Sequence, residues 1–310
     1  MFPVITVPTD AADALEPMGS KDKFWYFRDG DRWLFKRTRP GTGEDWSEKV
    51  AAELAELLSL PHARYELAEH DGVAGVVTPN FVPEGGLLFH GNEILSRLDP
   101  NYPDSGNSRR QYVRVPQHTV ERLARANSLT GLVRPPMNWN GLFDVQSPAE
   151  VVAGYLLLDA WIGNTDRHHE NWAWVGTHDD QGNPFFYLAP TFDHASSLGR
   201  NESDEKRRRR LDCTDPGFSV QAYVEKCRSA LYTDDSDTLP LTTYDAFVEF
   251  ARRFKMSNLW LLSLEGLSMT DVEDVFRRIP RSRISDTAAE FAMRILEHNR
   301  ARLLKLRDRL

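Results

Sequence analysis

The N-terminal part of the chain alternates short apolar runs with turn residues, a pattern typical of β-strands joined in hairpins. The expected strands are 24–27, 33–35, 65–67 and 73–77. An Asp-Gly pair lies within each of the two connections, ending at Gly30 and at Gly72, and this pair is a strong signal for a tight hairpin turn. We therefore expect two antiparallel strand pairs.

A helix is expected between the two strand pairs, over residues 45–59. Apolar residues recur there every three or four positions, which is the spacing of one helix face. Asp45 and Glu48 have the separation of a capping box. The breaker-rich segment 79–86 then ends this part, so we expect a small β-rich domain of residues 1–84 with one helix.

Beyond residue 84 the pattern becomes mainly helical. Helices are expected at 120–126, 148–162, 244–254, 271–278 and 285–306. The most apolar one, 148–162, starts with a Ser147 cap followed by proline, and we interpret it as a core helix whose role is to hold the following loop rigid. Apolar runs at 172–175 and 185–188 predict one more hairpin. The expected fold class is α+β, with a larger, mainly helical domain of residues 85–310.

Two segments rich in Pro, Gly, Ser, Asn and Arg, 99–116 and 199–217, are expected to be long loops. The second contains the basic run 206–210. Basic runs of this length can bind nucleic acid or an acidic protein surface. Acidic residues within 202–205 offset its charge. We therefore interpret the run as a solvated loop.

Composition argues against several classes of protein. The chain has 310 residues with 41% hydrophobic and 27% charged content, and its net charge of −8 argues against general nucleic-acid binding. Its cysteines, Cys213 and Cys227, form no CxxC pair, so neither a disulfide framework nor a thiolate zinc site is expected. We see no secretory leader and no apolar run of about 18 residues. A cytoplasmic protein without membrane segments is expected.

The polar residues most suited to chemistry lie in two short segments, 163–171 and 191–194. Asp166 and Asn171 are five positions apart after the apolar helix, and Asp193 follows an expected strand. A carboxylate can accept a proton from a substrate hydroxyl, whereas carboxylate and amide oxygens are ligands for Mg²⁺. We therefore predict phosphoryl transfer, with Asp166 facing the hydroxyl and Asn171 and Asp193 at the metal.

Two other interpretations of these segments stay open. The acids and amides could form a polar loop stabilised by Asx turns, since Asn and Asp readily fill such turns. Alternatively, three histidines could bind zinc with Asp166 and Asp193 in a metallohydrolase. These histidines are His168, His169 and His194. The absence of an HExxH-like helical pair in the sequence argues against the zinc site.

Lys36 and the segment 19–23 are the candidates for phosphate binding. Lys36 ends an expected strand with its head exposed, where its ammonium can reach α- and β-phosphates if Glu48 on the next helix steadies its charge. Taken alone, a lysine at a strand end is typically a solvated surface residue. The segment 19–23 precedes the first strand and could fold over phosphates, although a solvated turn explains it equally well.

In this order along the chain, these pieces resemble the HipA-type serine/threonine kinases, bacterial enzymes best known as toxin halves of toxin–antitoxin pairs. The matching segments are 19–23 (phosphate-contacting loop), 33–36 (lysine strand), 47–54 (glutamate helix), 163–171 (catalytic loop) and 188–193 (metal-binding segment). The resemblance implies a two-lobed protein-kinase-like fold. Its β-rich N-lobe would be residues 1–84 and its helical C-lobe residues 85–310.

The resemblance also implies roles for individual residues. Asp166 would be the catalytic base with His168 in support, and Asn171 and Asp193 would hold Mg²⁺. ATP would contact Gly19, Ser20, Lys21, Lys23, Lys36, Glu48 and, at a hinge between the lobes, Thr78, Asn80 and Phe81. Ser20 is a candidate autophosphorylation site, because phosphate there would add about −1.5 to −2 charge beside the bound triphosphate.

The chain departs from the family at its N-terminus, where it begins almost directly at segment 19–23. The family's additional N-terminal subdomain is therefore expected to be absent, and a separate partner protein or an antitoxin could supply it. The predicted activity is phosphorylation of a protein serine or threonine, with translation factors as the acceptor class that the family suggests. A small-molecule or lipid kinase of the same fold and a catalytically silent binding module are the alternatives.

Overall fold

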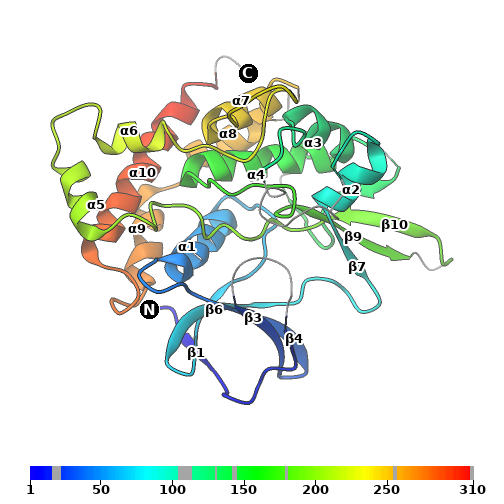
Figure 1. The fold of residues 1–310 in the computed structure, drawn as a ribbon, viewed down its shortest axis with the longest axis horizontal. Coiled ribbons are helices and arrows are strands. Elements are labelled where there is room, and N and C mark those ends of the chain that lie inside the picture. The colour runs from blue at the N-terminus through cyan, green and yellow to red at the C-terminus, as the bar shows by residue number, and fades with distance from the viewer. Residues whose placement is uncertain are drawn as a thin grey trace.

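The computed structural model describes residues 1–15, 22–103, 114–129, 131–141, 145–178, 181–253 and 257–307. It has two lobes, one built on a curled β-sheet and a larger one that is mainly helical (Figure 1). The predicted α+β fold class is confirmed. The predicted domain boundary after residue 84 falls between β6 and β7, the strands that end at Pro79 and begin at Leu87.

The smaller lobe is a six-stranded sheet in the order β1-β5-β6-β4-β3-β2. Its strands are β1 (Val4–Val7), β2 (Ala14–Leu15), β3 (Lys23–Arg28), β4 (Asp31–Arg37), β5 (Glu66–His70) and β6 (Val73–Pro79). β3 pairs antiparallel with β4, and β5 with β6, which confirms both predicted hairpins. Alternate residues of β3 point to one face, so Phe24 and Tyr26 share a small apolar core with Phe35 of β4.

Helix α1 (Glu44–Leu57) connects the two hairpins, as predicted, and packs against β5 and β6. The predicted capping box is wrong, because Gly43 occupies the N-cap position and makes no side-chain capping bond. The two acids of the supposed box have partners in the other lobe instead. Asp45 forms an ion pair with Arg283 at 3.2 Å, and Glu48 belongs to the candidate active site described below.

The larger lobe contains a second sheet in the order β7-β9-β10-β8. Its strands are β7 (Leu87–His90), β8 (Val133–Arg134), β9 (Ala173–His178) and β10 (Pro184–Leu188). β9 and β10 pair antiparallel, which confirms the third predicted hairpin. This hairpin joins the two polar segments that the sequence singled out, 163–171 and 191–194.

The helices of this lobe are α2 (Gly91–Leu98), α3 (Val120–Asn127), α4 (Pro148–Ile162), α5 (Asp204–Leu211), α6 (Val220–Val224), α7 (Thr243–Ala251), α8 (Ser257–Gly266), α9 (Met269–Arg278) and α10 (Asp286–Leu304). Each of the five expected helices is confirmed to within a few residues. α4 lies near the centre of the lobe and packs against α7, α8 and α10 (Figure 1). No helix in the described ranges is long and apolar enough to cross a membrane.

The segment 199–217 is not the long loop that we predicted, because it contains α5. Arg207 of this helix is buried and donates to the backbone carbonyls of residues 199 and 200, so the basic run is partly structural. A helix with a single apolar residue, Leu211, escapes prediction from apolar periodicity. α2, α6 and α8 were also not predicted, and most of the other expected loop, 99–116, lies outside the described residues.

Candidate active site

The predicted catalytic loop, 163–171, leaves the C-terminal end of α4. Gly163 ends the helix in the left-handed region at φ 66°, where a side chain would be strained, so the chain turns back sharply. Asn164 then donates to the Asp159 carboxylate at 2.8 Å and accepts from the Asp166 amide at 3.2 Å. These bonds fix the start of the loop to the helix that precedes it.

A buried ion pair holds the same loop from inside. Arg167 and Asp159 are 3% and 2% exposed, and their bidentate contacts measure 2.7 and 2.9 Å. Arg167 also donates to the Asn171 carbonyl at 2.6 Å and to the Thr191 hydroxyl at 2.9 Å. One guanidinium thus joins α4, the loop and the segment that leads to Asp193. α4 therefore holds the loop rigid, as we predicted, and it does so through Asp159 as well as through its apolar residues.

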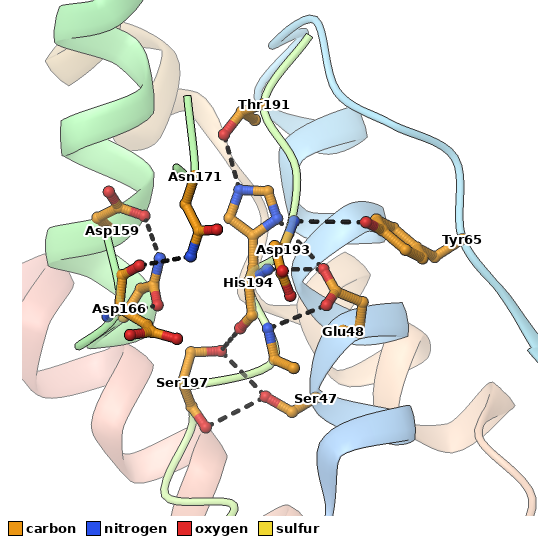
Figure 2. Close-up of polar contacts among 12 residues, drawn as sticks. Ser47, Glu48, Tyr65, Asp159, Asp166, Asn171, Thr191, Asp193, His194 and Ser197 are labelled. Carbon is orange, nitrogen blue, oxygen red and sulfur yellow. Dashed lines mark hydrogen bonds and ion pairs between the residues drawn. The ribbon is translucent and has the colours of Figure 1, made fainter. Parts of the chain in front are cut away.

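Asp166 and Asn171 present different oxygen atoms from this loop. The Asn171 side-chain nitrogen donates to the Asp166 carbonyl at 2.6 Å, which directs the amide oxygen away from that residue (Figure 2). The Asp166 carboxylate is 39% exposed and accepts a hydrogen bond from Ser196 at 3.4 Å. The loop therefore offers one accessible carboxylate and one neutral oxygen.

Lys36 and Asp193 meet where the two lobes join. Nζ of Lys36 lies 3.5 Å from Oδ1 of Asp193 and donates to the Tyr65 hydroxyl at 3.1 Å. The Asp193 amide, in a residue with φ 59°, donates to the same hydroxyl at 3.4 Å. In Figure 2 Tyr65 lies on the side of α1 and Asp166 on the side of α4.

The Lys36 side chain is 9% exposed, so the prediction that its ammonium group is exposed to solvent is wrong. Burial alone would lower the pKa of Lys36, but the nearby carboxylates and the Tyr65 hydroxyl raise that pKa above its usual range. The ammonium therefore stays charged at every physiological pH.

Glu48 makes no direct ion pair with Lys36, although its charge helps to raise the pKa of Lys36, as we predicted. It is buried on α1 and accepts from the amides of His194 and Ala195 at 2.7 and 3.1 Å. Its carboxylate also lies 3.5 Å from Nδ1 of His194. Glu48 thus ties α1 to the backbone that follows Asp193, and Asp193 takes the place beside the lysine.

The three histidines of these segments make other contacts instead of forming a zinc site. His168 accepts from a loop amide at 3.2 Å, and burial lowers its pKa, so its ring is neutral near pH 7. His169 contacts the Tyr102 hydroxyl at 2.6 Å, and His194 contacts the Thr191 hydroxyl at 2.8 Å. Within the described residues, no group of three or more His, Cys, Asp or Glu could hold a metal ion. The zinc interpretation loses its support.

A second charged network lies beside Asp166 and was missed in the sequence. Glu44 accepts from Arg39 at 2.6 Å and from Arg200 at 2.7 Å. Arg200 also donates at 3.0 Å to the Ser196 hydroxyl that contacts Asp166. The network orients this hydroxyl, and its members come from distant parts of the chain, so no local spacing could have identified it.

Some of the predicted ATP-contacting residues lie outside the part of the chain that the structure describes, and the others lie within it. Gly19, Ser20 and Lys21 lie outside the described residues. Lys23 begins β3 directly opposite Lys36 in the strand register.

The predicted hinge residues Thr78, Asn80 and Phe81 lie at and just after the end of β6. Thr78 is buried, and Asn80 closes a turn with the backbone of Val82 through bonds of 3.1 and 3.2 Å. The Phe81 ring packs against Phe192, with centroids 5.9 Å apart. Because Phe192 directly precedes Asp193, the hinge touches the segment predicted to bind metal.

No protein-family model and no curated protein matches the sequence. Solved structures do match its fold. The Helicobacter pylori proinflammatory kinase CtkA aligns with a TM-score of 0.73 and 18% identity over 99% of this chain and 98% of its own. A chain of the Shewanella oneidensis MR-1 HipA–HipB toxin–antitoxin complex with operator DNA aligns with a TM-score of 0.56 and 14% identity, over 96% of this chain and 68% of its own. The predicted two-lobed, kinase-like fold is confirmed.

Proposed function

We propose that the protein is an ATP- and Mg²⁺-dependent kinase of the HipA type, which phosphorylates a serine or threonine hydroxyl of a protein. One observation carries the proposal. Lys36 of the sheet lobe and Asp193 of the helical lobe lie 3.5 Å apart, and Arg167 ties the segment that leads to Asp193 to the loop that presents Asp166. A cation for phosphates, a carboxylate for a metal and a carboxylate for a proton are the parts that phosphoryl transfer uses.

Lys36 would neutralise the α- and β-phosphates. Its charge is maintained by the carboxylates around it, and the Tyr65 hydroxyl fixes the direction of the ammonium. Glu48 would act indirectly, by keeping the backbone of 194–195 against α1.

Asn171 and Asp193 would hold Mg²⁺, and their atoms fit this role. Asn171 already uses its side-chain N–H on a backbone carbonyl, which leaves the amide oxygen as the ligand, and the Asp193 side chain is 30% exposed. Mg²⁺ prefers hard oxygen donors of these two kinds and commonly completes its shell with water and phosphate. When bound, the metal would offset charge on the triphosphate.

Asp166 would accept the proton of the acceptor hydroxyl. As the hydroxyl oxygen forms its bond to the γ-phosphorus, the bond between that phosphorus and the bridging oxygen of ADP breaks, and ADP carries away the charge. Ser196 would hold the Asp166 carboxylate in position, and the neutral ring of His168 would support the loop backbone.

The acceptor class and partners follow from the resemblance to HipA-type kinases. A translation factor is the first acceptor to test, and an antitoxin or a protein equivalent to the N-terminal subdomain is the first partner. Purified protein is incubated with γ-labelled ATP and Mg²⁺, then separately with lysate proteins, lipids and sugars. Label on protein serine or threonine is expected. If only lipids or sugars were labelled, the protein would be a lipid or small-molecule kinase of the same fold. If ATP bound without phosphate transfer, a catalytically silent binding module would be favoured.

Variants test the assigned residues. Asp166→Asn and Asp193→Asn should each lower transfer by at least about 1000-fold while the fold persists, because each removes charge at the reacting groups and little packing. Glu273→Gln, at an exposed position of α9, is the control for loss of a carboxylate and should keep full activity. Wild-type turnover in both aspartate variants would refute the assignment.

Ser20 is proposed as an autophosphorylation site on the same basis. Phosphopeptide mapping after prolonged incubation with ATP should find phosphate there. An unmodified Ser20 in an otherwise active preparation would contradict this role.

A further inference from the structure

A cavity of about 310 Å³ lies against the catalytic loop, on the side of α5 and α6. The residues that matter in its lining are Thr165, Arg210, Phe218, Tyr223, Lys226 and Cys227. Thr165 immediately precedes Asp166, so one wall of the cavity belongs to the loop that carries the proposed base. None of the roles assigned above uses this space.

The Cys227 wall of the cavity is close to the loop and chemically inert. Cys227 is buried, and its sulfur is 3.6 Å from the position that a Cβ on Gly163 would take. Burial raises the pKa of Cys227 to about 12, so the thiol stays protonated and is a poor nucleophile. The cavity is therefore suited to binding rather than to covalent chemistry.

Positive charge gathers around Thr165. Arg210 and Lys226 line the cavity, and Arg114 donates to the Thr165 carbonyl at 2.9 Å. Glu202 pairs with Arg210 at 3.0 Å, whereas Lys226 and Arg114 have no carboxylate within ion-pair distance among the described residues. Arg210, Lys226 and Arg114 thus stand against the carboxylates of Glu202 and Asp166, the residue after Thr165. This local excess of positive charge, in a chain with net charge −8, favours binding of an anion.

Aromatic rings hold Arg210 in a defined orientation. Its guanidinium carbon lies 4.4 Å from the Phe218 ring centroid and 5.2 Å from that of Tyr223. Nε donates to Glu202 at 3.0 Å, and Nη1 to the Phe218 carbonyl at 3.4 Å. A guanidinium fixed in this way keeps further N–H donors for carboxylate or phosphate oxygens.

We propose that this cavity binds an anionic side chain of the acceptor protein, a carboxylate or a phosphate, on a residue that flanks the phosphorylated serine or threonine. The inference rests on the proposed kinase function, since Asp166 must face the acceptor hydroxyl. The volume suits a single side chain. An anion bound beside Thr165 is then only a few residues of extended chain from a hydroxyl at Asp166.

Binding is measured separately from transfer, by fluorescence anisotropy with three labelled serine peptides. They differ only in their flanking residues, which are glutamate, phosphoserine or lysine. The wild-type protein should bind the two anionic peptides about tenfold more tightly than the lysine peptide at low salt. The difference should shrink in about 1 M salt, and comparing the two anionic peptides identifies the preferred anion.

Charge reversal at one exposed lysine tests the position of the site. Lys226→Glu should weaken both anionic peptides about tenfold and abolish the preference over lysine. Lys206→Glu makes the same change at an exposed position of α5 outside the cavity lining and should leave the preference intact. Equal effects of the two variants, or equal binding of all three peptides by the wild type, would overturn the inference.

Transfer to the same peptides separates this inference from the proposed function. With Asp166→Asn as the inactive control, labelled ATP should give most product on the anionic peptide that binds best. Anion-selective binding that is lost in Lys226→Glu, without transfer by the wild type, supports the cavity and refutes the kinase. Transfer without preference for anionic peptides refutes the cavity and leaves the kinase standing.

Discussion

The two sides of the candidate active site are held together in different ways. On the α4 side, Arg167 is 3% exposed and makes hydrogen bonds of 2.6, 2.7 and 2.9 Å. On the α1 side, Lys36 is 3.5 Å from Asp193, and the Asp193 amide is 3.4 Å from the Tyr65 hydroxyl. The loop with the proposed base is held by short, dry bonds. On the phosphate-binding side the backbone after Asp193 is also held by short bonds, of 2.7 and 3.1 Å to Glu48, whereas the contact between the Lys36 and Asp193 side chains is longer.

This difference indicates which half of the site is positioned before a substrate arrives. A fixed base lowers the entropic cost of aligning the acceptor hydroxyl. The longer contact between Lys36 and Asp193, whose side chain is 30% exposed, can shorten or exchange when phosphate and metal enter. We therefore expect damage on the α4 side to appear first as lost stability, and damage on the α1 side mainly as lost transfer.

Arg167→Ala should cause the largest loss, about 3–5 kcal/mol in the free energy of unfolding, because Asp159 would remain buried without its cation. Urea denaturation measures this loss. The double change Asp159→Leu with Arg167→Met should restore much of it, since no charge is then left buried. A loss below about 1 kcal/mol for the single variant would show that the pair does not anchor the loop.

His118 makes the same side sensitive to acid. Burial lowers its pKa from 6.5 to about 3, and Trp172, next to the catalytic loop, donates to its Nε2 at 3.2 Å. Because the folded-state pKa is the lower one, the unfolded chain binds the proton first as pH falls, and stability is lost from about pH 6.5 down towards pH 3.

Between pH 7 and pH 5 this group should cost about 2 kcal/mol in the free energy of unfolding. Urea titrations at the two pH values measure the loss. His118→Gln keeps a hydrogen-bonding side chain that does not titrate. Between pH 7 and pH 5 the free energy of unfolding of this variant should therefore fall by about 2 kcal/mol less than that of the wild type. An identical pH dependence of the two proteins would exclude His118 as the source.

Lys36→Met should change the free energy of unfolding by only about 1 kcal/mol, because Asp193 can turn to water when its partner is lost. Transfer should nevertheless fall about 100-fold, since the phosphates lose their cation. Urea denaturation and steady-state kinetics give the two numbers. Lys305→Met, at an exposed position, is the matched control. A stability loss as large as that of Arg167→Ala would remove the proposed difference between the two sides.

Ser196→Ala should have the smallest effect, within about 0.5 kcal/mol in stability and about threefold in transfer. Asp166 loses a single bond of 3.4 Å, and Arg200 loses one of 3.0 Å but keeps its ion pair with Glu44. Initial rates over a range of ATP concentrations measure the effect on transfer. Ser196→Thr keeps the hydroxyl and should restore the rate. A decrease that matches that of Lys36→Met would make Ser196 a principal part of the site.

Local patterns were enough to predict the hairpins and α4, because strand alternation and a Ser147 cap act over a few residues. The sequence also singled out residues that the fold brings together, Lys36 and Asp193 as well as Asp166 and Asn171, although it paired Lys36 with Glu48. Their roles in catalysis stay predictions.

The supporting contacts could not be predicted, because they form only between elements far apart in the chain. Glu48 was assigned to a lysine, yet its carboxylate is used by backbone amides that carry no signature in the sequence. Arg167 and Asp159 had one available signal, an acid set among leucines and tryptophan near the end of an apolar helix. Such an acid is rarely buried without a partner.

The contact between Phe81 and Phe192 makes the hinge and the proposed metal end of the site one packing unit. If the adenine base of ATP bound beside Phe81, it would also contact or displace Phe192, and Phe192 directly precedes Asp193 in the chain. Binding at the two ends would then share free energy, and linkage requires each event to change the affinity of the other by the same factor. The nucleotide and the metal would thus bind cooperatively, as the two parts of a single metal–nucleotide ligand.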